Sequence, residues 1–194
     1  DACFRLTGWQ CVQQGFSPRL SINLSAASLQ DPVLIERVAD TLAASGFEAR
    51  NLLLEVTETS LVRDVERAQQ NILNLKKLGV KLAVDDFGTG YSSLRYLRQF
   101  SIGMLKIDRS FVSGLGLNHD DDVIVETIIR MAASLGIQVV AEGVETAGQQ
   151  AILCGLGCDF LQGYLLGQPL DSPMSELLFA RSERRLLKLG NDAF

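Results

Sequence analysis

The stretch Val80-Lys81-Leu82-Ala83-Val84-Asp85-Asp86-Phe87-Gly88-Thr89-Gly90-Tyr91-Ser92-Ser93 predicts a buried strand that ends in two adjacent carboxylates. A glycine-rich and hydroxyl-rich loop follows the two aspartates directly. Two anionic side chains at the mouth of a buried strand repel each other and resist desolvation. Divalent cations are the usual remedy, and a loop with two glycines can fold closely over whatever those cations hold. For the Asp-Asp dipeptide alone, the competing interpretation is a strand-to-helix turn in which an Asp caps the helix.

Strand-like and helix-like patterns alternate along the rest of the chain. The expected strands are 19–24, 52–56, 80–84, 104–107, 137–141 and a short one near Phe160. The expected helices are 1–14, 31–45, 65–78, 94–97, 120–135, 146–156 and 174–189. This alternation implies a parallel sheet with right-handed crossover connections. There is no linker or composition break, so residues 1–194 are expected to form one domain, with 172–194 as its C-terminal helix and tail.

The chain length favours two architectures. A closed barrel of eight strand–helix units takes about 250 residues, or roughly 31 per unit. Six such units need about 190 residues, close to the 194 of this chain. The sequence therefore predicts an α/β fold that is either an open sheet or a (β/α)8 barrel with six of its eight strands, the first two being absent.

Composition excludes several classes of function. The chain is 47% hydrophobic, which is enough for a full core, and its net charge is −5. The core region has no lysine- or arginine-rich block, so the chain is not expected to bind a polynucleotide, although a small phosphorylated ligand held through metals is compatible. Its apolar runs are too short to span a membrane, so we expect no membrane contact by this domain. Cys154 and Cys158 lie four apart and could form half of a metal site, but no second Cys or His pair has zinc-type spacing. We therefore expect Cys3, Cys11, Cys154 and Cys158 to be buried free thiols in a reducing, cytoplasmic compartment.

Each expected strand ends in polar residues that its apolar run does not explain. They are Asn23, Glu55 with Glu58, Asp85 with Asp86, Lys106 with Asp108, Glu142 with Glu145, and Gln162. In a parallel barrel these strand ends meet on one face, where active sites lie. Each residue alone has an ordinary explanation: Asn23 could satisfy a turn, and Lys106 could pair with a nearby carboxylate. The joint pattern favours an active site, because burying so many polar groups together is costly.

The types of side chain indicate the chemistry. Amide and carboxylate oxygens suit hard cations such as magnesium or manganese. Two such ions about 4 Å apart form a clamp for in-line displacement at phosphorus. A lysine beside them can orient a water or neutralise charge on phosphoryl oxygens. The residues thus predict metal-assisted hydrolysis of a phosphoester.

Two other enzyme classes share part of this pattern. An enolase-like barrel also places carboxylates and a lysine base at successive strand ends. The adjacent Asp85-Asp86 pair favours two ions over the enolase-like arrangement. A protein kinase interpretation of Asp86-Phe87-Gly88 fails, because the sequence has no His-Arg-Asp loop and no upstream phosphate loop.

The motifs at these strand ends resemble those of the EAL domain, a family of bacterial phosphodiesterases of the second messenger cyclic di-GMP. The matching segments, in family order, are Asn23-Leu24-Ser25, Glu55-Val56-Thr57-Glu58, Asp85 to Leu94, Leu105-Lys106-Ile107-Asp108, Ala141 to Thr146 and Gln162-Gly163-Tyr164. The resemblance covers nearly all of residues 1–170. It implies a modified TIM barrel whose first strand is antiparallel to the rest, and hydrolysis of cyclic di-GMP to linear pGpG with two magnesium or manganese ions.

The resemblance also implies a role for each matching residue. The metal ligands would be Asn23, Glu55, Asp85 and Asp86, with Asp85 bridging the two ions. The catalytic residues would be Lys106, Glu142, Glu145 and Gln162, and the residues close to substrate would be Gly88, Thr89, Gly90 and Asp108. Glu58 would anchor the loop 87–93. The partners it implies are a second copy of the domain and sensory or GGDEF-type modules in the parent chain, where any membrane anchor would lie.

The sequence departs from the family at one motif, and this departure is expected to affect activity. The Glu-Ala-Leu tripeptide that names the family does not occur in this sequence. We interpret the chain as truncated at its N-terminal side, and the alternative is a catalytically inactive receptor for cyclic di-GMP. Residues 1–194 alone are therefore expected to be unstable or inactive, because they lack one metal ligand.

Overall fold

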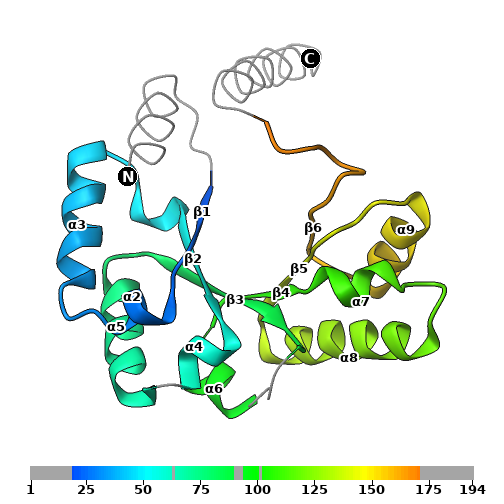
Figure 1. Ribbon diagram of the computed structural model, residues 1–194, viewed down its shortest axis with the longest axis horizontal. Helices are drawn as coiled ribbons and strands as arrows, with labels where there is room; N and C mark the ends of the chain where they lie inside the picture. Colours follow the sequence, from blue (N-terminus) through cyan, green and yellow to red (C-terminus); the bar gives the residue numbers. More distant parts are fainter. Residues whose placement is uncertain (1–18, 63, 90–93, 101, 171–194) are drawn as a thin grey trace, which may run out of the picture.

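The computed structural model describes residues 19–62, 64–89, 94–100 and 102–170. Six parallel strands in sequential order form a curled half-barrel (Figure 1). The strands are β1 (Leu20–Asn23), β2 (Leu52–Thr57), β3 (Lys81–Phe87), β4 (Met104–Ile107), β5 (Gln138–Ala141) and β6 (Phe160–Leu161). The six expected strands and the parallel sheet are thereby confirmed. The helices expected at 1–14 and 174–189 lie outside the described residues.

Helices connect the strands on the outer side of the sheet. The longer ones are α3 (Leu34–Ser45), α5 (Val65–Lys77), α8 (His119–Leu135) and α9 (Ala147–Leu156). Figure 1 shows α3 and α5 beside the first strands, and α8 and α9 beside the last. The shorter ones are α2 (Ala26–Leu29), η1 (Ala49–Asn51), α4 (Glu58–Val62), α6 (Leu94–Gln99) and α7 (Arg109–Ser113). Of these, α2, α4 and α7 follow strand ends closely and were not predicted.

The core lies between the strands and the outer helices. Side chains alternate between the two faces of a strand, so one face of β2 carries Leu54 and Val56 while the other carries Glu55. The buried side chains of the outer face and of the helices form one cluster, which includes Leu54, Val56, Leu82, Val84, Leu105, Ile107, Ile72, Leu75, Val125 and Ile129. Burial of this face leaves the other face of the strands to carry the polar side chains.

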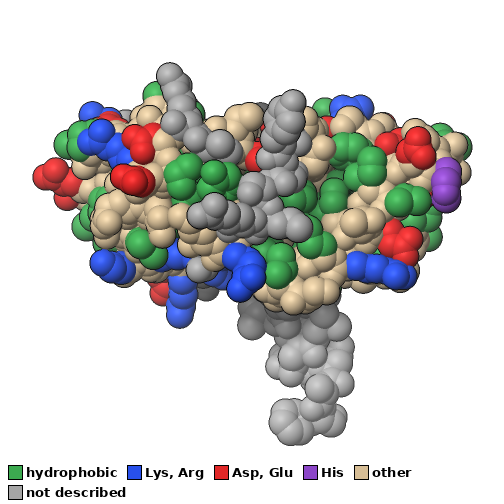
Figure 2. All heavy atoms as spheres, turned by 90° about the horizontal axis from the view of Figure 1, so that it is seen from below, with side chains coloured by type: hydrophobic (Ala, Val, Ile, Leu, Met, Phe, Trp, Pro, Cys, Tyr) green, Lys and Arg blue, Asp and Glu red, His purple; other side chains and the backbone are tan. Residues whose placement is uncertain are grey.

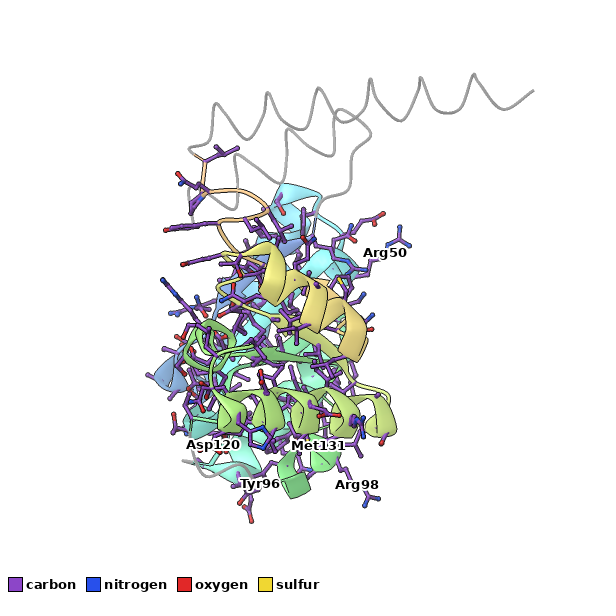
Figure 3. All side chains as sticks on the ribbon, turned by 90° about the vertical axis from the view of Figure 1, so that its right-hand side faces the viewer. Arg50, Tyr96, Arg98, Asp120 and Met131 are labelled. Atoms are coloured by element: carbon purple, nitrogen blue, oxygen red, sulfur yellow. The ribbon has the colours of Figure 1, made fainter. Side chains whose placement is uncertain are left out.

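Polar caps mark where α8 and α9 begin. The side chain of Asn118 accepts a hydrogen bond from the backbone N–H of Asp120 at the start of α8. Asp120 to Asp122 occupy the first turn, where the helix dipole favours negative charge, as the sequence predicted. Figure 3 shows Asp120 at one end of this helix and Met131 further along it. Thr146 and Gln149 form a reciprocal capping box at the start of α9.

The surface of the described residues gives two further observations. None of the helices described is both long enough and apolar enough to cross a lipid bilayer. On the face drawn in Figure 2, Lys and Arg side chains lie in separate groups around the rim, with hydrophobic side chains between them.

The two described cysteines differ in exposure. Cys154 is exposed on α9, so the expectation of a buried thiol is wrong there, because its neighbour Leu153 takes the inward position. Cys158 is partly buried, and its Sγ lies 3.3 Å from the backbone oxygen of Phe160. Burial raises the pKa of the Cys158 thiol to about 11.

We predict that iodoacetamide at pH 8 labels Cys154 at least about tenfold faster than Cys158, because the thiolate is the reactive form. Peptide mapping by mass spectrometry measures the two rates. In urea the two thiols should react at similar rates, and equal rates in the folded protein would contradict the prediction.

Gly163 allows the chain leaving β6 to lie directly against Val144. A Cβ at position 163 would lie 2.2 Å from the backbone oxygen of Val144 and 2.3 Å from its backbone nitrogen. Val144 N–H also donates to the Gln162 carbonyl at 3.0 Å, and Leu165 N–H donates to the Val144 carbonyl at 3.1 Å. The backbone at this place therefore has no room to move away from an added methyl group.

We predict that Gly163→Ala lowers the free energy of unfolding by about 3 kcal/mol through this overpacking. The matched control is Gly155→Ala in α9, where an added Cβ meets nothing within 4 Å. That control should be stabilising by about 0.5 kcal/mol, since Ala is the better helix former. Urea unfolding of both variants tests the pair, and similar stability of Gly163→Ala and the unmodified chain would refute the close approach.

Candidate active site

Lys106 lies at the centre of a cluster of carboxylates. Its Nζ is 2.7 Å from Glu55 Oε2, 3.0 Å from Asp85 Oδ1 and 2.6 Å from Glu142 Oε1. The Lys106 side chain is only 7% exposed, and the three carboxylate side chains are between 9% and 20% exposed. Four of the residues predicted from the strand ends are thus in direct contact.

The sheet brings these four side chains together. Glu55 lies on β2, Asp85 on β3 and Lys106 on β4, while Glu142 follows β5 directly. In parallel strands, register partners point to the same face. Thr57 of β2 is the register partner of Asp85, so Asp85 shares the inner face with Glu55. The carboxyl ends of four neighbouring strands therefore place their polar residues at one point.

Charge dominates the energetics of the cluster. Burial alone would lower the pKa of the Lys106 ammonium, but hydrogen bonds to Glu142, Glu55 and Asp85 outweigh burial and raise that pKa above its ordinary value. Burial raises the pKa of the Glu142 carboxyl, and Lys106 opposes that rise only in part. One ammonium faces three carboxylates, so the cluster keeps an excess of negative charge.

Two further donors hold the carboxylates in place. The hydroxyl of Ser21 on β1 donates a hydrogen bond to Glu55 Oε1. The backbone N–H of Asp86 donates to Asp85 Oδ1 at 3.1 Å. Asp85 Oδ1 therefore contacts both the Lys106 ammonium and the backbone N–H of Asp86. Strand β3 continues through both aspartates to Phe87, beyond the expected end at residue 84.

Asp86 differs from Asp85 in its backbone and its surroundings. Its φ of 53° lies in the left-handed region, which is uncommon for a residue other than glycine. The pairing of β3 with β4 shifts register between Val84 and Phe87, the segment that contains Asp86. Partial desolvation and then the charge of Asp85 raise the pKa of the Asp86 carboxyl. The N–H and hydroxyl of Thr89 both donate to the Asp86 carbonyl, at 3.3 and 2.8 Å, and so fix the turn.

The other predicted residues lie around this cluster. Asn23 ends β1, is exposed, and is the register partner of Glu55, which places both on one face. Glu58 begins α4 directly after β2. Gly88 has a φ of 98°, and an added Cβ there would lie 3.1 Å from the Phe111 ring of α7. Gly90 lies outside the described residues, so the predicted role of Glu58 in anchoring the loop 87–93 stays a prediction.

Asp108 has a structural role in addition to its predicted contact with substrate. It is the N-cap of α7, and its Oδ1 accepts from the backbone N–H of Ser110 at 2.9 Å. The hydrogen bond from the Ser110 hydroxyl lowers the pKa of the Asp108 carboxyl. An Asp that caps a helix directly after a strand, the competing interpretation of Asp85-Asp86, is therefore found at Asp108 after β4.

A cleft of about 180 Å³ opens beside Glu142. Its lining includes Arg109, Glu145, Gln162 and Tyr164. Arg109 Nη2 pairs with Glu145 Oε1 at 2.8 Å, so Glu145 contacts this cleft rather than Lys106. Arg109 was not predicted from the sequence, although its place just after the fourth strand could have indicated it. The roles of Gln162 and Glu145 in catalysis stay predictions.

The donor set suits a hard divalent cation in its chemistry. Glu55, Asp85, Asp86 and Asn23 offer carboxylate and amide oxygens on neighbouring strands, and the excess negative charge favours a cation. Across the described ranges, however, no three His, Cys, Asp or Glu side chains are grouped so that they could hold a metal ion. The carboxylates here are gathered around the Lys106 ammonium.

Comparisons with known proteins identify the family of the chain. A model of the EAL domain matches residues 1–169. The bifunctional diguanylate cyclase/cyclic di-GMP phosphodiesterase MucR of Pseudomonas aeruginosa is 42% identical over 179 residues, covering 92% of this chain and 26% of MucR. The chain spans about a quarter of the length of its curated relatives.

Solved structures resemble the chain closely. The EAL domain of Mycobacterium smegmatis DcpA gives a TM-score of 0.84 at 37% identity, covering 93% of this chain and 81% of that one. Klebsiella pneumoniae BlrP1, in its manganese/cy-diGMP complex, gives a TM-score of 0.76 at 35% identity, covering 84% of this chain and 41% of that one.

We predict that Lys106→Met lowers the free energy of unfolding by about 3 kcal/mol in metal-free buffer, because it leaves the buried carboxylates without their cation. Lys81→Met is the matched control, since Lys81 is exposed on β3 and its loss changes net charge equally. The control should change stability by under about 0.5 kcal/mol. Denaturant unfolding with chelator measures both, and equal stability of the two variants would show that the cluster does not need its ammonium.

Proposed function

The chain belongs to the EAL domain family, and on this basis we propose that it hydrolyses cyclic di-GMP to linear pGpG. The observation that carries the proposal is the convergence of Glu55, Asp85 and Glu142 on Lys106, within 3.0 Å of its ammonium. MucR, 42% identical, carries cyclic di-GMP phosphodiesterase in its name. A structural role alone would not explain four polar side chains buried together at the strand ends.

The residues that would hold magnesium or manganese are Asn23, Glu55, Asp85 and Asp86. When bound, two such ions would supply a nucleophilic water and neutralise charge on the phosphoryl oxygens for in-line attack. The solved BlrP1 complex contains manganese and cy-diGMP, which supports the choice of ion.

The chain's own residues would orient the reactants. Lys106 places a fixed positive charge beside the carboxylates, where it can donate a hydrogen bond to the attacking water and stabilise developing negative charge. Glu142, whose Oε1 lies 2.6 Å from the ammonium, can hold the same water. The cleft lined by Arg109 and Gln162 adjoins Glu142 and would receive part of the dinucleotide. The turn at Gly88 and Thr89 would lie close to the substrate.

The second candidate is a receptor that binds cyclic di-GMP without cleaving it. The observation that favours it is that Glu55, Asp85 and Glu142 gather around the Lys106 ammonium instead of leaving an open site for ions. Incubation of the protein with cyclic di-GMP and manganese, followed by chromatography, separates the two candidates. Formation of pGpG supports the enzyme, and saturable binding without product supports the receptor.

We predict that Asp85→Asn lowers the rate of pGpG formation at least about 100-fold, because it removes one charge from the proposed ion clamp. Asp40→Asn on the exposed side of α3 is the matched control and should keep full activity. Circular dichroism should show the same fold for both variants. Near-normal turnover by Asp85→Asn would make the assignment of Asp85 as a metal ligand wrong.

A further inference from the structure

Two predicted metal ligands, Glu55 and Asp85, direct carboxylate oxygens at the Lys106 ammonium. Glu55 Oε2 and Asp85 Oδ1 both lie within 3.0 Å of its Nζ. Glu142 Oε1 supplies a third oxygen at 2.6 Å. The ammonium therefore satisfies the carboxylates in the way that a bound cation would.

These contacts conflict with those that a divalent ion needs. Magnesium contacts its oxygen ligands directly at about 2.0–2.1 Å, through the same lone pairs that accept hydrogen bonds. The remaining oxygen of Glu55, Oε1, already accepts from Ser21, and Asp85 Oδ1 also accepts from the Asp86 N–H. A fixed positive charge repels a second cation placed within a few ångströms in a partly desolvated site.

We propose that Lys106 is the resident cation of the metal-free site and that divalent metal binds in competition with it. Lys106 then weakens the affinity of the site for metal, and in the metal-free protein it stabilises the carboxylates by pairing with them. The inference rests on the proposed function for the presence of a metal, but it concerns binding of the metal alone. A purely organising role for Lys106 makes the opposite prediction, because removal of an organising residue would weaken metal binding.

The first test is calorimetric titration of the full chain with Mn²⁺ alone. We expect the Kd for Mn²⁺ to fall at least about tenfold in Lys106→Met, because the charge repulsion is removed. Lys81→Met removes the same charge from an exposed site and should stay within about twofold of the unmodified chain. An unchanged or higher Kd in Lys106→Met overturns the proposal, as does the lack of Mn²⁺ binding by every variant.

The second test uses the unmodified chain and holds even if Lys106→Met does not fold. With ¹⁵N-labelled lysine, the ammonium of Lys106 should give a slowly exchanging NMR signal, identified by its absence from Lys106→Arg. Saturation with Mg²⁺, monitored by calorimetry, should shift or abolish this signal as the carboxylates leave the ammonium. A signal that persists unchanged at saturation overturns the proposal. The proposed function is judged separately by pGpG formation, so the two can fail independently.

Discussion

The contact of one buried ammonium with three carboxylates is the interaction on which the rest of this structure depends. Lys106, Glu55, Asp85 and Glu142 are separated by up to 87 positions in sequence, yet their charged atoms lie within 3.0 Å of one nitrogen. Charged groups removed from water are tolerated only when they are paired. Each strand must therefore be in the correct register with its neighbours, so that its polar residue lies level with theirs and points to the same face.

The strand register meets this requirement. Because side chains alternate along β2, burial of Leu54 and Val56 against the outer helices directs Glu55 to the inner face. A shift of one residue in that strand would move Glu55 into the apolar core and expose its neighbours. The hydrophobic core and the charged cluster thus stabilise the same register, although they lie on opposite faces of the sheet.

Most of the fold and much of the site could be predicted from local sequence. Apolar runs with polar ends gave all six strands, and the shared polarity of those ends indicated that they converge. What could not be predicted depends on geometry beyond the local pattern. The single turn of α7 depends on Asp108 acting as a cap, and the Arg109–Glu145 pair depends on how the chain after β4 meets the chain after β5. Local periodicity also gave no sign that Cys154 would face solvent, because α9 is apolar on more than one face.

The two adjacent aspartates show how a single irregularity divides like charges. In a regular strand, Asp85 and Asp86 would point to opposite faces, and one of them would enter the apolar core. The left-handed backbone at Asp86 and the register shift before Phe87 interrupt that alternation. Asp85 then reaches Lys106, Asp86 stays exposed at the mouth of the site, and Phe87 returns to the core at 4% exposure. The left-handed backbone at Asp86 is therefore the local feature that lets one strand end hold Asp85 in the cluster while Asp86 faces solvent.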